Sequence, residues 1–202
     1  MARYTGPKHK LARREGVNIL GKVSQSLERR LNVLPGSLNR RGRRVRTSEY
    51  GLQLREKQKL KRIYGLMEKQ FRKNVIEAQR MTENTDEALI QLLETRLDNI
   101  VYRLGFAHSR PMARQMVSHG HIQVNGKKVN IPSYKIKVGD KVAVSEKFLS
   151  NEMNKKSLED IQLELLPSLV KTKNTGELKR MPTMEEIANP VEYQLVIEFY
   201  SR

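Results

Sequence analysis

Residues 96–129 read RLDNIVYRLGFAHSRPMARQMVSHGHIQVNGKKV and combine three local signals within one short stretch. An amphipathic stripe that starts near residue 85 runs to Gly105, so a helix is predicted to close there. Ser109, followed two residues later by a proline, is typical of the start of a second, short helix. Asn125-Gly126 between alternating residues indicates a tight β-hairpin. The stretch therefore predicts a helix, a turn, a short helix and a hairpin.

Upstream of this stretch, the sequence predicts an arm followed by a long helical segment. Residues 1–47 are interrupted by glycine and proline, and much of this arm is expected to become ordered only against a partner. Ser48 favours a helix start, and apolar residues then recur every three or four positions over 60–75. Gly65 lies inside this stripe, where we expect it to bend or split the helix.

Downstream of the hairpin, the sequence predicts short strands and loops. Residues 141–144 (KVAV) read as a strand, and the apolar side chains of residues 191–200 alternate in the same way. Between them, residues 155–165 are expected to form a helix that is followed by loops. The pattern indicates an α+β protein: a helical first domain with an extended basic arm, and helices packed on a small, mainly antiparallel sheet.

The charge of the chain is large and unevenly placed. The 202 residues carry 39 Lys and Arg against 22 Asp and Glu, a net charge of +17. Residues 1–80 alone hold 22 Lys and Arg against 6 Asp and Glu, a balance of +16. A membrane surface would require an apolar face opposite the basic one, and residues 37–46 (SLNRRGRRVR) have none. Nucleic acid is therefore the favoured partner.

Composition excludes several other classes of protein. Without cysteine the chain has no disulfide, thiolate zinc site or iron–sulfur cluster. No apolar run approaches the roughly 18–20 residues of a membrane span, and the first residues do not resemble a secretory signal. We expect a soluble protein that carries no cofactor.

Three motifs resemble catalytic or metal sites without meeting their requirements. Residues 16–23 (GVNILGKV) lack the hydroxyl that a nucleotide-binding loop needs after its lysine. The two histidines of 119–121 (HGH) cannot complete a zinc shell, so contact with a phosphate, a helix cap or no role is expected instead. Residues 96–98 (RLD) resemble a triplet of pseudouridine synthases, but a local ion pair inside the helix is the favoured interpretation. No metal or catalytic residue is predicted.

The residues of the opening stretch together predict an RNA-binding surface. One helix carries Arg96 and Arg103, the next carries Arg110 and Arg114, and the hairpin carries Asn125, Lys127 and Lys128. Two basic helix faces and a basic hairpin that meet at one edge would bind the phosphates and 2′-hydroxyls of folded RNA.

These features divide the chain into four expected parts. They are a basic arm at 1–47, the helical part of the first domain at 48–93, the RNA-binding module with a following sheet and loop region at 94–190, and a strand and tail at 191–202.

Several long stretches resemble a known family. They include 1–7 (MARYTGP), 48–59 (SEYGLQLREKQK), 96–105 (RLDNIVYRLG), 117–122 (VSHGHI) and 196–202 (VIEFYSR). On these residues the chain resembles bacterial-type small-subunit ribosomal protein four. The resemblance covers nearly the whole chain and is weakest at 23–40 and 150–190.

The resemblance implies a non-enzymatic, cytoplasmic ribosomal protein that binds small-subunit ribosomal RNA and nucleates assembly at a multi-helix junction. It also implies contact with small-subunit protein five and a place beside the path of incoming messenger RNA, with a role in decoding accuracy. Arg43 and Arg46 correspond to residues that help to melt messenger structure there. Metal-bearing relatives have cysteines where His9 and Ala12 stand, so no metal is expected in the arm.

The predicted RNA-contacting residues are mainly cations, with a few aromatic and polar side chains. They are Arg3, Tyr4, Lys8, Lys10, Arg13, Arg14, Arg40, Arg41, Arg43, Arg44, Arg46, Tyr50, Arg55, Lys57, Lys59, Lys61, Arg62, Arg96, Arg103, Ser109, Arg110, Arg114, Gln115, His119, His121, Asn125, Lys127 and Lys128.

Two other functions remain open at this point. An RNA-modifying enzyme could use the same module, but it would need a separate catalytic domain, and residues 151–202 are too short for one. A free-standing RNA chaperone of stalled ribosomes would usually be shorter and would lack the long first domain.

Overall fold

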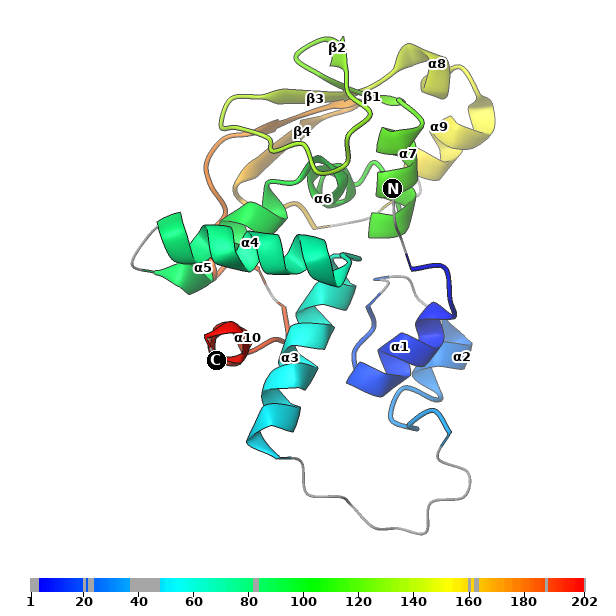
Figure 1. The fold of residues 1–202 in the computed structure, drawn as a ribbon. Helices are drawn as coiled ribbons and strands as arrows, with labels where there is room; N and C mark the ends of the chain where they lie inside the picture. The colour runs from blue at the N-terminus through cyan, green and yellow to red at the C-terminus, as the bar shows by residue number, and fades with distance from the viewer. Residues whose placement is uncertain are drawn as a thin grey trace. The chain divides into compact units, whose positions relative to one another are not determined.

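The computed structural model describes residues 4–19, 21, 24–36, 48–81, 84–159, 161, 164–187 and 189–201. The chain forms two compact units, one of Met1–Asp86 with Asn189–Arg202 and one of Glu87–Ala188 (Figure 1). The second unit is thus inserted between two parts of the first in the sequence.

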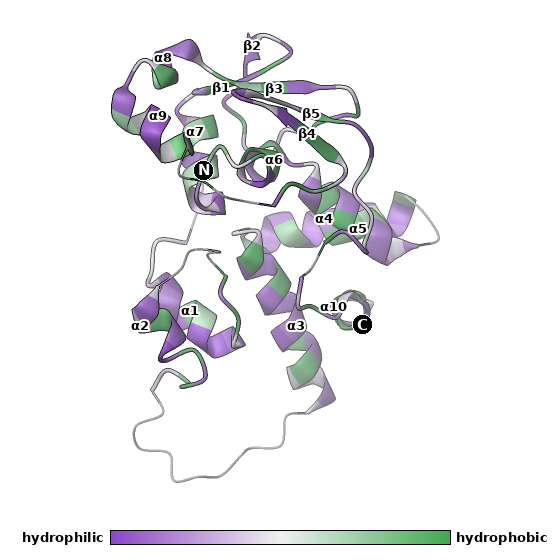
Figure 2. Cartoon of the chain, turned by 180° about the vertical axis from the view of Figure 1, so that it is seen from behind, coloured by the Kyte–Doolittle hydropathy of each residue, from purple (hydrophilic) through white to green (hydrophobic). Residues whose placement is uncertain are grey.

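The first unit is helical, as the sequence predicts. Its long helices are α3 (Glu49–Ile63) and α4 (Glu68–Met81). The Ser48 side chain accepts a hydrogen bond from the Gly51 amide at 3.2 Å and caps α3. Gly65 has a φ of 63° and lies between α3 and α4, which confirms the predicted break. Polar and apolar segments alternate along α3 (Figure 2), because one of its faces packs in the core and the other is solvated.

The predicted strand at 191–200 is wrong: this segment forms helix α10 (Tyr193–Tyr200), which packs against α3. Tyr193 and Val196 are its buried residues, a spacing of three that suits a helix face. Seven of the ten residues 191–200 are apolar, so the apolar positions fit a period of two as well as a period of 3.6. The contacts with α3 and α4 select the helix.

The N-terminal segment contains two helices that weak periodicity did not reveal. They are α1 (Lys8–Glu15) and α2 (Gln25–Glu28), with Ala12 and Leu27 buried. Glu15, whose side chain is 1% exposed, pairs with Arg62 and Arg55 of α3. This ion-pair cluster fixes the end of α1 against α3.

The second unit is built on a five-stranded antiparallel sheet of order β2-β1-β3-β5-β4. The strands are β1 (Ile122–Val124), β2 (Lys127–Lys128), β3 (Lys141–Val144), β4 (Leu169–Thr172) and β5 (Thr175–Leu178). The first three confirm the predicted hairpin and strand. The β4–β5 hairpin was predicted as loop, because its turn, with Lys173 at a φ of 41°, lacks the Asn-Gly signal. Short helices α8 (Glu146–Leu149) and α9 (Glu152–Glu159) precede it.

Helix α5 (Thr85–Glu94) begins where the sequence predicts, but the stripe that runs to Gly105 is not one helix. The chain breaks at Thr95 and Arg96 before α6 (Leu97–Arg103). Arg96 is extended there and forms a β-bridge with Lys135, while the Leu97 amide donates to the Tyr134 carbonyl at 2.8 Å. These partners lie far along the chain, so a local pattern could not predict the break.

Helices α6 and α7 (Arg110–Ser118) cover one face of the sheet (Figure 1). The core between them contains Val101 and Leu104 of α6, Val117 of α7, and Ile122 and Val142 of the sheet, all fully buried. Apolar burial of this kind stabilises the unit and fixes where the polar ends of α6 and α7 lie.

Candidate nucleic-acid interface

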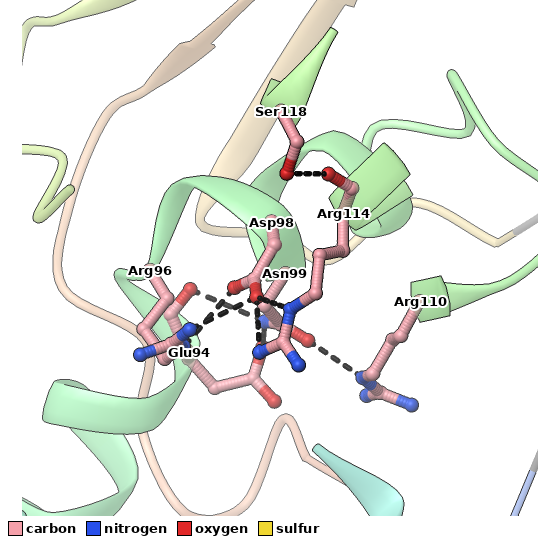
Figure 3. A network of polar contacts seen from close by, with 7 residues as sticks. All are labelled: Glu94, Arg96, Asp98, Asn99, Arg110, Arg114 and Ser118. Carbon is pink, nitrogen blue, oxygen red and sulfur yellow. Dashed lines mark hydrogen bonds and ion pairs between the residues drawn. The ribbon is translucent and has the colours of Figure 1, made fainter. Parts of the chain in front are cut away.

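The break before α6 and the start of α7 bring two arginines onto one buried carboxylate (Figure 3). Arg96 donates to both oxygens of Asp98, from Nε to Oδ1 at 3.0 Å and from Nη2 to Oδ2 at 2.9 Å. Arg114 of α7 donates to Oδ2 from Nε at 3.0 Å and from Nη2 at 2.8 Å. The side chain of Asp98 is only 6% exposed. The local ion pair predicted for 96–98 is therefore confirmed, with Arg114 as an additional partner.

A second carboxylate, that of Glu94, binds Arg103 directly and joins Arg110 through the Asn99 amide; Figure 3 shows the links from Glu94 to Arg110. Arg103 forms two hydrogen bonds with Glu94, at 3.0 Å and 2.8 Å, and the Glu94 side chain is 1% exposed. Asn99 donates to Glu94 Oε2 at 2.6 Å and accepts from Arg110 Nε at 2.8 Å. Asn99 thus links α5 to α7.

This arginine network, made of Arg96, Arg103, Arg110 and Arg114 with Glu94, Asp98 and Asn99, has a residual positive charge. Four guanidinium groups face two carboxylates, so its formal charge is +2. The Arg110 guanidinium also lies over the Tyr102 ring, 4.6 Å from its centroid. Long cationic side chains normally lose rotamer entropy when they bind, and these are already held in place.

Arg96, which the sequence predicts as an RNA contact, is buried in the structure. Its side chain is only 6% exposed, and the edge of its guanidinium formed by Nε and Nη2 is directed at Asp98. Arg96 therefore supports the network from inside, while Arg103 and Arg114, 20% and 17% exposed, lie nearer the surface. Ser109 precedes α7 without a side-chain capping bond, and Gln115 is exposed on α7.

The hairpin carries exposed cations on a well-defined turn. Asn125 and Gly126 have φ values of 49° and 76°, the left-handed pair that a two-residue hairpin turn requires. Asn125 accepts from the Lys141 amide at 2.9 Å and donates to Asp140 at 2.8 Å, so its side chain holds the turn. Lys127 and Lys128 are exposed on β2.

His119 and His121 lie where α7 ends and β1 begins. His119 is the exposed C-cap residue of α7, while His121 is half-buried with its ring centroid 5.0 Å from that of Phe148. Burial lowers the pKa of His121, and the positive charges of His119, Lys128 and Lys147 lower it further.

In the first unit, the predicted cations divide between paired and exposed side chains. Lys57, which the sequence predicts as an RNA contact, is buried: it donates to Glu68 at 3.0 Å and lies 4.6 Å from the Phe199 ring centroid. Lys61 donates to the same carboxylate at 2.8 Å. Partial burial alone would raise the pKa of Glu68, but hydrogen bonds from Lys61, Tyr200 and Lys57 outweigh it and lower that pKa to about 2.

The remaining predicted residues of this unit are placed as follows. Arg55 and Arg62 pair with Glu15, and Lys59 pairs with Glu56. Arg13 donates to the Val33 carbonyl at 2.8 Å. The side chains of Tyr4, Lys10, Arg14 and Tyr50 are exposed, and that of Lys8 is half-buried. Arg3, Arg40, Arg41, Arg43, Arg44 and Arg46 lie outside the described residues.

Sequence reasoning missed the groups that hold the arginines. Glu94 and Asn99 were not predicted as part of the site, although Glu94 lies nine residues before Arg103 and contacts it across the helix break. Lys147, on α8, was missed as a neighbour of His121. Only the Arg96–Asp98 pair had a sequence signal.

Searches for other kinds of site were negative within the described part of the chain. No three of its His, Asp and Glu side chains gather as metal ligands would. None of its helices is long and apolar enough to cross a membrane.

Comparisons with known proteins match the chain along its length. Residues 3–94 match the family described as Ribosomal protein S4/S9 N-terminal domain, and residues 95–142 match the S4 domain. Similar curated proteins include one from Akkermansia muciniphila at 49% identity, one from Brevibacillus brevis at 46% and one from Neisseria meningitidis serogroup C at 47%. Each is named small ribosomal subunit protein uS4, and each alignment covers 100% of this chain and 100% of the relative.

Proposed function

This chain belongs to the uS4 family of small ribosomal subunit proteins, and we propose that it binds small-subunit ribosomal RNA at a multi-helix junction and nucleates subunit assembly there. Family membership makes it a non-enzymatic structural constituent of the small ribosomal subunit with an RNA-binding module. The RNA-modifying enzyme considered above is thereby set aside.

One observation supports the RNA-binding proposal most strongly: the arginine network holds four guanidinium groups against two carboxylates, a net charge of +2. The same unit also carries exposed lysines on β2. Phosphate groups accept hydrogen bonds from guanidinium in a planar, paired geometry. Because the network holds its cations before RNA arrives, less side-chain entropy is lost on binding. We assign Arg103, Arg110, Arg114, Lys127 and Lys128 to phosphate contact.

Binding to a ribosomal RNA transcript at several salt concentrations tests this function. Each lost phosphate contact should lower the salt slope by about one. Arg110→Ala with Arg114→Ala should therefore weaken binding by a few kcal/mol, about 1.5–3 kcal/mol per charged hydrogen-bonding group, and reduce the slope by about two. Lys155→Ala with Lys156→Ala on α9, where both side chains are exposed, is the charge-matched control.

The proposal requires that the two double variants differ in their affinity for the RNA transcript. Equal loss of affinity would mean that net charge alone drives binding, and an unchanged affinity after loss of Arg110 and Arg114 would remove the network from the interface. Indifference of the wild-type chain to salt would contradict RNA binding through phosphates altogether.

Three finer roles are proposed on the resemblance and on charge. They are contact with small-subunit protein five, a position beside incoming messenger RNA, and an influence on decoding accuracy. The charge of +16 on residues 1–80 supports contact with a second RNA strand, and Arg43 and Arg46 are its proposed carriers. Arg43→Ala with Arg46→Ala in assembled subunits should slow translation through a messenger hairpin and leave unstructured messages unaffected; equal rates on both messages would contradict the role.

A further inference from the structure

Four basic side chains gather at one edge of the second unit, close to the arginine network in sequence but outside it. His119 ends α7, His121 leads into β1, Lys128 lies on β2 and Lys147 on α8. The two imidazole ring centroids are 6.0 Å apart. Three separate elements thus deliver positive charge to one place, which we call the histidine cluster.

Gly120 allows one of these cations to approach closely. Its φ of 72° is left-handed, and a Cβ atom there would collide with the Lys128 side chain and lie 2.8 Å from its Nζ. The lysine stem therefore crosses the backbone between the two histidines. From this position the positive charge of Lys128 acts on His121.

His121 has a charge environment that opposes its protonation. Its ring packs against Phe148 of α8, and burial is the main cause of its lowered pKa. The charged groups that act on it, His119 from α7, Lys128 from β2 and Lys147 from α8, are all basic. An anion beside the ring would reverse this balance, because an opposite charge within about 4–6 Å favours the protonated imidazole.

We propose that the histidine cluster binds a phosphate group of RNA and that His121 takes up a proton when it does so, which makes RNA binding tighter as pH falls. The inference rests on the proposed RNA-binding function and adds a specific site and a proton to it. The reaction is balanced: free imidazole and a solvent proton become imidazolium, which pairs with the phosphate. Affinity rises tenfold for each unit by which binding raises the pKa of His121.

The test measures binding of the full chain to the ribosomal RNA transcript at pH 6, 7 and 8 and constant ionic strength. The wild-type chain should bind several-fold more tightly at pH 6 than at pH 8, because at pH 6 only part of the tenfold gain per unit of pKa is realised. His121→Gln keeps a polar planar side chain but cannot gain a proton, so its affinity should stay near the wild-type value at pH 8 throughout. His108→Gln, at an exposed histidine of the same unit, is the matched control and should keep the full pH response.

Calorimetry in buffers of different ionisation heat provides a second measurement on the wild-type chain. Binding near pH 7 should take up a fraction of one proton, and exposed His119→Gln should reduce that uptake without unfolding the chain. This measurement decides the matter if His121→Gln does not fold.

The possible outcomes distinguish failure of the proton-uptake proposal from failure of the proposed RNA-binding function. Strong, salt-dependent RNA binding with no pH response or proton uptake would overturn the inference and leave the function standing. A His121→Gln chain that keeps the wild-type pH response would also overturn it, because the proton would then belong to another group or to the RNA. Absence of salt-dependent binding at every pH would overturn both.

Discussion

Arg114 reaches from α7 to Asp98 at the start of α6 with two hydrogen bonds of 3.0 Å and 2.8 Å to a single oxygen, Oδ2. Asp98 is thus shared between a surface arginine and the buried Arg96. A residue that would bind RNA is held by an acid that would repel it. The carboxylate lowers the net positive charge of the network, but it also holds the guanidinium groups in a fixed position.

Asp98→Asn should therefore weaken RNA binding although it adds positive charge. The buried Arg96 would lose its counter-charge, and breaking such a pair costs about 3–5 kcal/mol of unfolding free energy. Urea unfolding and RNA titration of the same sample measure both effects. Glu185→Gln, at an exposed site, changes the net charge equally and should leave stability unchanged. Tighter binding by Asp98→Asn would show that charge outweighs position.

Glu68 makes the first unit sensitive to acid. The pKa of Glu68 in the folded protein, about 2, lies below its ordinary value of 4.5. The unfolded chain therefore takes up a proton first as pH falls, and the stabilisation present above about pH 4.5 is lost between about 4.5 and 2. The difference in free energy of unfolding between wild type and Glu68→Gln, measured with urea, should decrease as pH falls from about 4.5 to 2. A gap that stays constant from pH 6 to pH 3 would contradict the assignment.

Gly120→Ala should be more harmful than Gly139→Ala. Both glycines have a positive φ, 72° and 89°, so each substitution carries a backbone cost of about 1–2 kcal/mol. Only at Gly120 would the new Cβ meet another side chain, that of Lys128. Thermal unfolding should show the larger loss at Gly120, and Lys128→Ala in the same chain should recover the difference. Equal losses would mean that Lys128 moves away freely.

Gly176→Ala tests the packing of β5 on α6. A Cβ at Gly176 would lie 2.9 Å from Leu104 Cγ, which is fully buried in the core. Overpacking of this kind costs about 1–3 kcal/mol. Leu104→Ala should partly compensate Gly176→Ala, so the two changes together should cost less than their sum. Strict additivity in urea unfolding would place the two residues out of contact.

Much of the fold could be predicted because many of its helix ends and turns are set by local residues. Ser48 acts through a hydrogen bond to an amide three residues along the chain, and Gly65, Gly105 and the Asn125-Gly126 turn act through their own backbone angles; each lies where the sequence predicts. The break at Thr95–Arg96 depends on partners near residue 135, and α10 depends on α3. Both features depend on contacts between residues that are distant in sequence, so the local sequence pattern does not predict them.

The sequence could predict which arginines belong to the candidate site, but not which residues they contact. Arg103, Arg110 and Arg114 could be recognised as one basic surface from their spacing alone. Their acidic and amide partners, Glu94 and Asn99, meet them only after the chain folds at residue 95. The same limit applies to Lys57, whose burial depends on the rings of α10.

Because the chain is synthesised from its N-terminus, the division into two units affects the order in which they can fold. Residues 87–188 form a compact body of contiguous sequence, which can fold as soon as it has emerged. Helices α3 and α4 are made earlier, yet their partner α10 is translated only after that whole body. The first unit is thus begun first and completed last, and until α10 is made the faces of α3 and α4 that pack against it lack this partner.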